Sequence, residues 1–318
     1  MIRKMQKAFD NCKSFLIVGI LTSMLAPTLV PLDALAAGAP PVPPPLPGQR
    51  GSTFQECMQY GDSSLKTLSF QCAADNYRLA TQFMPTDPNA HFGLAIALHH
   101  LGLTDDALPE IFEAIKLRPD LWDARFLFGQ MLMKKGSFDE AGGQFLQILK
   151  AKPNDLATRG NLAVCYMQKG QLEAAAQQLK YICETDPKNI DGHYNLACVY
   201  DLQKEVDKAI EEFKKVIQIE PKHPMAYVEL AKCLLDKGDF KSSTILCKRA
   251  LQMNANNYHA MLVLGRSFEL QGSQKEAIQW YKKAILLNPR DPAMKKLENN
   301  LMKARAKELG LTDVLQPR

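Results

Sequence analysis

Prolines recur along this chain at a fixed interval of 34 residues. Six of them lie on this period, and the single missed position holds Ala255. An internal period of this length is the sequence signature of stacked repeats, each of which buries its apolar surface against its neighbours. The six prolines are Pro85, Pro119, Pro153, Pro187, Pro221 and Pro289.

Two columns of the repeat, counted from Phe54, hold almost only the smallest side chains. Position 8 contains only Gly or Ala, and position 20 contains Ala in every repeat except the sixth, which has Ser243. Small residues at a fixed spacing indicate a close approach of two helices, because a larger side chain would overpack the contact. The seven repeats are 54–87, 88–121, 122–155, 156–189, 190–223, 224–257 and 258–291.

Large apolar residues recur within each repeat at helical spacing, mainly at positions 7, 11 and 24. Positions 4, 7, 8 and 11 share one face of a first helix, and positions 17, 20, 24 and 27 share one face of a second. Glycine at position 15 of five repeats predicts the end of the first helix. The proline at position 32 ends the second helix. The sequence therefore predicts two amphipathic helices in each repeat.

Taken together, the columns resemble the tetratricopeptide repeat family. The resemblance covers residues 54–291 and implies an all-α fold, a right-handed α-solenoid of about seven helix pairs plus a C-terminal capping helix. Repeat four shows the pattern with Leu162, Ala163, Tyr166, Gly170, Ala175 and Pro187. Position 4 departs from the family, where it is often Trp. It holds Cys57, His91, Arg125, Arg159, His193, Tyr227 and Met261.

The same resemblance implies that the first helices line a concave groove that binds a peptide or a partner helix. Apolar side chains occupy its columns in repeats two to four, and charged ones follow in repeats five to seven. The asparagines at position 6 either hold a peptide backbone or merely fit the repeat pattern. If the groove is open, replacing both Phe92 and Phe126 by Ala weakens binding without lowering the melting temperature. The expected groove residues are Phe92, Ile96, Phe126, Gln130, Met133, Asn161, Val164, Met167, Tyr194 and Asn195.

Residues 1–36 have the layout of a secretory signal peptide. Basic residues precede an apolar run from Phe15 to Val30, and small residues follow at Ala34 and Ala36. We expect cleavage after Ala36; without cleavage, the segment would be a single N-terminal anchor. Either way the repeats are expected outside the cytoplasm, in the periplasm or cell envelope of a bacterium, or secreted.

Two further segments flank the repeats. Residues 37–53 form a proline-rich linker, best interpreted as a semi-rigid spacer, with a ligand for an aromatic-lined groove as the alternative. Residues 292–318 form the predicted capping helix and tail, where Met294, Leu297 and Leu301 recur at helical spacing. The lysines and arginine around them leave a basic docking site open as a second interpretation.

Charge and motifs exclude several functions. Without the leader the chain keeps 35 basic and 32 acidic side chains, which is too balanced for a nucleic-acid surface. The common hydrolase and phosphate-binding motifs are missing from the sequence. His99 and His100 are adjacent and diverge on a helix, so they make a poor chelating pair. We therefore expect no enzyme activity, no cofactor and no metal site.

Seven cysteines follow the leader, and an odd number leaves at least one thiol free or paired between chains. Cys165, Cys198 and Cys233 fall at similar positions of successive first helices. Packed thiols are the favoured interpretation there, and a disulfide bridge or a metal site stays open. A disulfide between Cys57 and Cys72 also stays open in an oxidising compartment.

These expectations define a function: an exported, non-enzymatic scaffold that binds a protein segment in its groove, in envelope assembly, secretion or pilus biogenesis. The alternative is a regulatory or substrate-docking subunit of an envelope enzyme acting on glycan or peptidoglycan. We expect a monomer that contacts the membrane only through an uncleaved leader.

Overall fold

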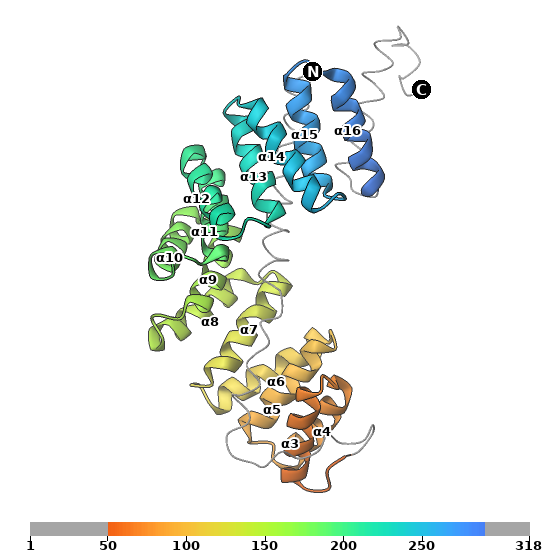
Figure 1. Cartoon of the computed structure of the whole chain (residues 1–318). Helices are drawn as coiled ribbons and strands as arrows, with labels where there is room; N and C mark the ends of the chain where they lie inside the picture. Colours follow the sequence, from red (N-terminus) through yellow and green to blue (C-terminus); the bar gives the residue numbers. More distant parts are fainter. Residues whose placement is uncertain (1–49, 290–318) are drawn as a thin grey trace, which may run out of the picture. The chain divides into compact units, whose positions relative to one another are not determined.

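The computed structural model describes residues 50–289, and in this range the chain forms fourteen α-helices and no β-strand (Figure 1). The helices follow one another as pairs, which confirms the predicted all-α repeat fold for this part of the protein. The predicted leader, most of the linker and the predicted capping helix lie outside the described residues.

The first helix of each repeat begins 34 residues after the previous one. These first helices are α3 (Phe54–Lys66), α5 (Pro88–His100), α7 (Trp122–Lys135), α9 (Leu156–Gln168), α11 (Ile190–Leu202), α13 (Pro224–Asp236) and α15 (Tyr258–Leu270). The second helices are α4 (Phe70–Phe83), α6 (Thr104–Leu117), α8 (Phe138–Ala151), α10 (Leu172–Thr185), α12 (Val206–Ile219), α14 (Phe240–Met253) and α16 (Gln274–Leu287).

The residue just before most first helices caps the helix N-terminus. Asp87 accepts a hydrogen bond of 2.8 Å from the backbone N–H of Ala90, and Asn189 accepts one of the same length from Gly192. Such caps satisfy a backbone donor that has no partner inside the helix. Thr53, Asp155, His223 and Asn257 cap α3, α9, α13 and α15 in the same way.

Position 15 ends the first helix in a left-handed backbone conformation. The five glycines at this position have φ angles from 72° to 84°, as glycine at a helix end commonly does. In repeats one and five the same conformation is adopted by Leu68, with φ 57°, and by Lys204, with φ 67°. The turn between the paired helices is thus kept even where its preferred residue is missing.

In repeats one, three and seven, the glycine at position 8 lies under the aromatic ring at position 24 of the same repeat. A Cβ atom on Gly61 would lie 2.8 Å from the Tyr77 ring, and one on Gly265 would lie 2.6 Å from the Tyr281 ring. Both tyrosines are buried, as are the alanines at position 20. In these repeats the close approach predicted at position 8 is therefore a contact between a helix backbone and an aromatic ring.

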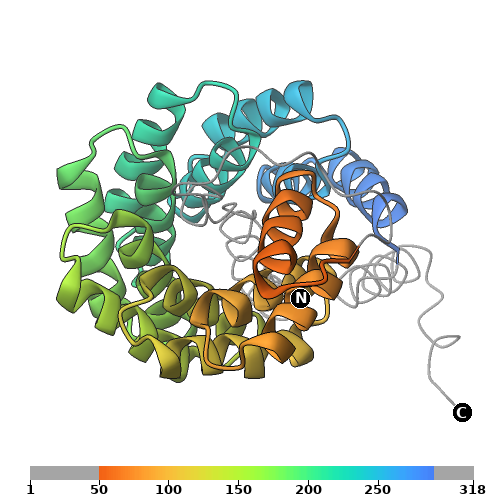
Figure 2. The same cartoon turned by 90° about the horizontal axis from the view of Figure 1, so that it is seen from below.

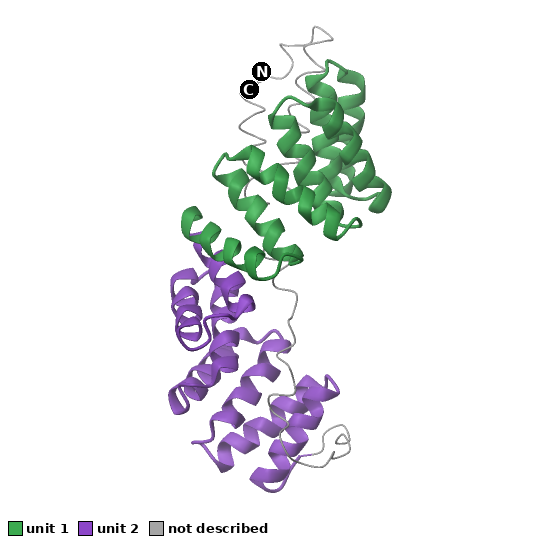
Figure 3. Ribbon diagram, turned by 60° about the vertical axis from the view of Figure 1, so that its left-hand side comes forward, with its two compact units in different colours: residues 1–21, 172–318 green, residues 22–171 purple. Residues whose placement is uncertain are grey.

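The described residues divide into two compact units, 50–171 and 172–289 (Figure 3). In the first unit, each helix from α3 to α9 packs against the next, and the second unit repeats this arrangement from α10 to α16 (Figures 1 and 2). Within the described range, no helix has the length and apolar character needed to cross a membrane.

Candidate functional site

Eight of the ten expected groove residues lie in the unit 50–171, on first helices α5, α7 and α9. Phe92 and Ile96 are 1% and 5% exposed and belong to the core cluster of the first repeats. Met133, Val164 and Met167 are also buried. The expectation that Phe92 can be truncated without loss of stability therefore does not hold, because alanine there would remove core contacts.

The remaining aromatic groove residues are half-buried and touch the core with one edge. Phe126 meets Phe145 with ring centroids 5.8 Å apart, and Tyr194 meets Phe213 at 5.7 Å, both edge-to-face. In each case a ring at position 5 packs on the ring at position 24 of the same repeat. Burial raises the pKa of Tyr194 well above its usual range, so its hydroxyl stays protonated.

The two asparagines at position 6 anchor themselves to their own helices. The amide of Asn161 donates to the carbonyl of Ala157 at 3.0 Å, and that of Asn195 donates to Asp191 at 2.7 Å. The Oδ1 atom of Asn195 is buried and has no hydrogen-bond partner among the described residues. A buried acceptor without a donor is unusual in folded proteins, and a peptide N–H could reach this one only if the side chains that cover Asn195 move aside.

Charged side chains follow on the first helices of the unit 172–289. Lys232 of α13 lies 2.9 Å from Asp201 of α11 and 3.2 Å from Glu229, and all three side chains are largely buried. Burial lowers the pKa of Lys232, but the charges of Glu229 and Asp201 outweigh burial and raise it. Two carboxylates around one ammonium leave a net negative charge at this point.

Position 4 has a structural role that the repeat pattern does not reveal. In five consecutive repeats its side chain donates a hydrogen bond to the carbonyl of the proline that ends the preceding repeat. The pairs are His91 with Pro85, Arg125 with Pro119, Arg159 with Pro153, His193 with Pro187 and Tyr227 with Pro221, at 2.8 to 3.2 Å. A signal for this role is present in the sequence, because these residues all have a side-chain donor.

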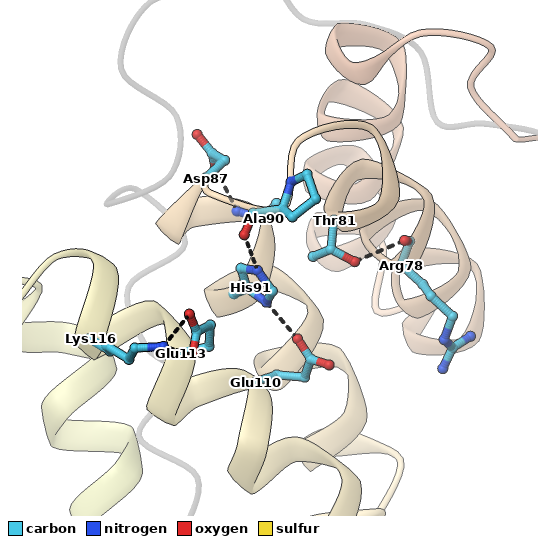
Figure 4. Close-up of polar contacts among 9 residues, drawn as sticks. Arg78, Thr81, Asp87, Ala90, His91, Glu110, Glu113 and Lys116 are labelled. Carbon is cyan, nitrogen blue, oxygen red and sulfur yellow. Dashed lines mark hydrogen bonds and ion pairs between the residues drawn. The ribbon is translucent and has the colours of Figure 1, made fainter.

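In repeats two, three and five, the position 4 side chain also binds position 23 of its own repeat. The Nδ1 atom of His91 lies 2.6 Å from a carboxylate oxygen of Glu110 (Figure 4), and Arg125 donates to Gln144 at 2.7 Å. His193 and Glu212 repeat the first contact at 2.6 Å. Each of these side chains thus connects the preceding turn to the second helix of its own repeat.

Among the described residues, one group has the composition of a metal site, and no motif in the sequence indicates it. Cys183 of α10, His193 of α11 and Glu212 of α12 each offer a ligand atom, and these atoms lie within 4.8 Å of one another. The residues are 10 and 19 positions apart in the sequence and come from three consecutive helices. Only the packing of consecutive repeats brings them together.

None of the seven cysteines after the leader forms a disulfide in this structure, so neither a Cys57–Cys72 bridge nor one among Cys165, Cys198 and Cys233 is formed. Burial raises the pKa of Cys165 to about 12, and it also raises the pKa of Cys198 and Cys233. These thiols therefore stay protonated and act as small packed side chains.

Comparison with known protein families matches most of the described chain. The family "Tetratricopeptide repeat protein 21 C-terminal ARM domain" matches residues 126–309, and the family "Tetratricopeptide repeat" matches residues 65–121. A search of curated proteins gives no match.

Solved structures show the same fold at low sequence identity. A tetratricopeptide repeat protein from Parabacteroides merdae has a TM-score of 0.64 and 15% identity, covering 78% of this chain and 98% of its own. The C-terminal part of a repeat protein from Cytophaga hutchinsonii has a TM-score of 0.60 and 18% identity, covering 75% of this chain and 98% of its own. PilF of Pseudomonas aeruginosa has a TM-score of 0.56 and 17% identity, covering 67% of this chain and 97% of its own. From its helix pairs and these family matches, the chain belongs to the tetratricopeptide repeat family.

Proposed function

We propose that this protein is a non-enzymatic scaffold that holds a peptide or a partner helix on the face formed by its first helices. The repeat family supports a role in protein binding, since its members generally serve as interaction scaffolds. The proposal rests mainly on one observation: the buried Oδ1 atom of Asn195 has no hydrogen-bond donor in the described part of the chain. A bound peptide would supply that donor through a backbone N–H.

The chemistry of the first helices suggests what kind of segment binds. The half-buried ring of Tyr194 offers an apolar contact. The two carboxylates around Lys232 leave a net negative charge, which favours a cationic group nearby. The segment is therefore expected to carry both apolar and basic side chains, since charge complementarity governs which partners are accepted.

The cellular setting is a second part of the proposal. The basic, apolar and small-residue layout of residues 1–36 supports export to the cell envelope, with cleavage after Ala36. Intact-mass analysis of protein recovered from the envelope tests this, because a chain that still begins at Met1 contradicts cleavage. Light scattering of the same sample tests the proposed monomer.

The binding proposal can be tested with paired asparagine variants. The double variant Asn161→Ala with Asn195→Ala removes both position 6 asparagines, and Asn256→Ala removes an exposed amide in a turn as the control. Partners cross-linked to the wild type in envelope extract should be retained by the control and lost by the double variant. Binding of the captured segment, as a synthetic peptide, should weaken in the double variant alone. Equal binding by all three proteins would place the site elsewhere.

A further inference from the structure

We propose that Cys183, His193 and Glu212 form a zinc site, with the thiolate, an imidazole nitrogen and a carboxylate oxygen as three of its four ligands. Zinc binds such atoms tetrahedrally at about 2.0 to 2.3 Å, which places the ligand atoms roughly 3 to 4 Å apart. The three ligand atoms already lie within 4.8 Å of one another, so small side-chain rotations complete the site. A mixture of sulfur, nitrogen and oxygen ligands favours zinc over magnesium or calcium.

The imidazole of His193 is already oriented as a metal ligand. Its Nε2 atom lies 3.1 Å from the carbonyl of Pro187, and because a carbonyl only accepts, Nε2 carries a hydrogen. Its Nδ1 atom is turned toward Glu212 at 2.6 Å. Metal-binding histidines usually donate their second ring N–H in this way, which fixes the ring and increases the basicity of the binding nitrogen. Zinc would take the place of the proton between Nδ1 and the carboxylate.

The surrounding charges accommodate a cation. Lys215 binds the Oε1 atom of Glu212 at 2.8 Å, which leaves Oε2 for the metal, and the Lys215 side chain is 50% exposed and can move away. Glu184 and Asp186 lie close enough to Cys183 to act on its charge. Burial, followed by the charge of Glu212, raises the pKa of the Cys183 thiol to about 12. Zinc binds the thiolate form of cysteine, so zinc binding releases the thiol proton.

We use the word joint for the contact between two consecutive repeats around the histidine at position 4. The equivalent joint three repeats earlier lacks the sulfur ligand. His91 binds Glu110 and the carbonyl of Pro85 just as His193 binds its partners, but Thr81 stands at the position of Cys183. The histidine–carboxylate pair alone is thus a structural contact. The joint between repeats four and five differs because the thiol of Cys183 adds a third ligand to the pair of His193 and Glu212.

A glycine accompanies the cysteine and makes room for it. Gly192 stands where the earlier joint has Ala90, and a Cβ atom on Gly192 would lie 3.3 Å from the Cys183 sulfur and 2.9 Å from Ile182. Such distances are tighter than ordinary packing, so the glycine keeps the space beside the thiol open. A bound zinc ion would then connect α10 to α11 and α12 and stiffen this joint.

The test uses the full, reduced and metal-free chain. Cobalt, which absorbs light when bound by a thiolate, reports the sulfur ligand, and zinc competition against a coloured chelator gives the affinity. We expect one zinc per chain and a thiolate–cobalt absorption band. Cys183→Thr copies the residue found at the earlier joint and should therefore fold, which circular dichroism checks. It should abolish the band and weaken zinc binding on the order of 100-fold or more, since loss of even an outer-shell partner of a ligand costs about 10- to 100-fold.

Two further variants make the test specific. Cys72→Ser removes another half-buried thiol and should leave the cobalt band and the zinc affinity unchanged. Thr81→Cys combined with Ala90→Gly should build a second site beside His91 and raise the stoichiometry to two. The proposal is overturned if the folded wild type shows no thiolate–cobalt band, or if Cys183→Thr keeps the band and the affinity of the wild type.

Discussion

The backbone of Gly129 lies directly against the ring of Phe145: a Cβ atom on this glycine would be 2.6 Å from Cε1 of the ring. Phe145 is fully buried, so the ring has little space to move. Repeat five combines Ala197 with Phe213 at the same two positions, so a ring above an alanine exists in this protein. The cost of a methyl group on Gly129 is thus the cost of displacing one packed ring.

Gly129→Ala is expected to lower the free energy of unfolding by about 1 to 3 kcal/mol, as overpacking of a core does. Gly143→Ala is the matched control, because it lies in the next helix and a Cβ there meets no atom within 4 Å. The control should raise stability by up to about 1 kcal/mol, the helix preference for alanine over glycine. Urea unfolding followed by circular dichroism measures both. Equal effects would contradict the close approach.

Much of this arrangement could be predicted from the sequence, because the same small and apolar positions recur in each of the seven repeats. Small residues at positions 8 and 20, together with glycine at position 15, are enough to indicate helix pairs. Single sequences usually leave a small residue ambiguous between surface and core. Here seven aligned repeats reveal which positions tolerate only small side chains. At position 8 of repeats one, three and seven, the physical reason is an aromatic ring that lies against the helix backbone.

Lys204→Gly and Leu68→Gly should stabilise the protein. Both residues hold a left-handed backbone, which costs an ordinary residue about 1 kcal/mol more than glycine. Both side chains are exposed, so little packing is lost. The urea midpoint should therefore rise for each variant.

Gly136→Ala provides the reverse test at the same position of another repeat. Its φ angle is 83° and no atom would contact the added methyl group, so only backbone strain is introduced. This variant should lower the urea midpoint. A rise for Gly136→Ala, or a fall for Lys204→Gly, would show that the turn conformation does not limit stability.

Tyr227→Phe tests the bond between position 4 and the preceding proline. The change removes only the hydroxyl that donates to the carbonyl of Pro221 at 3.2 Å, while the buried ring stays. Loss of one such bond should lower the free energy of unfolding by about 1 kcal/mol. Tyr166→Phe, at a half-buried ring in repeat four, is the control and should change stability less. Urea unfolding of both variants decides between a stabilising bond and a mere contact.

The candidate sites are harder to predict than the fold, because they depend on packing that no single repeat contains. The resemblance places Phe92 in a groove by its position in the repeat, yet its side chain is buried in the core cluster of the first repeats. Cys183 lies at the end of one repeat and His193 near the start of the next. Their approach to Glu212 follows from how consecutive helices pack, and sequence spacing alone does not encode it.

His99 should make the protein less stable in mild acid. Its pKa is lowered to about 4 by burial, with smaller contributions from the charges of Lys134 and His100, and its Nδ1 atom is buried without a hydrogen-bond partner among the described residues. In the unfolded chain a histidine has a pKa of about 6.5. Between these two pH values the unfolded state therefore binds more protons than the folded state. The free energy of unfolding falls as the pH drops from about 6.5 to about 4. Below about pH 4, His99 is protonated in both states and causes no further change in stability. Urea midpoints measured across this range should show the decline, and His99→Gln should reduce it. An unchanged slope in His99→Gln would assign the acid sensitivity to other groups.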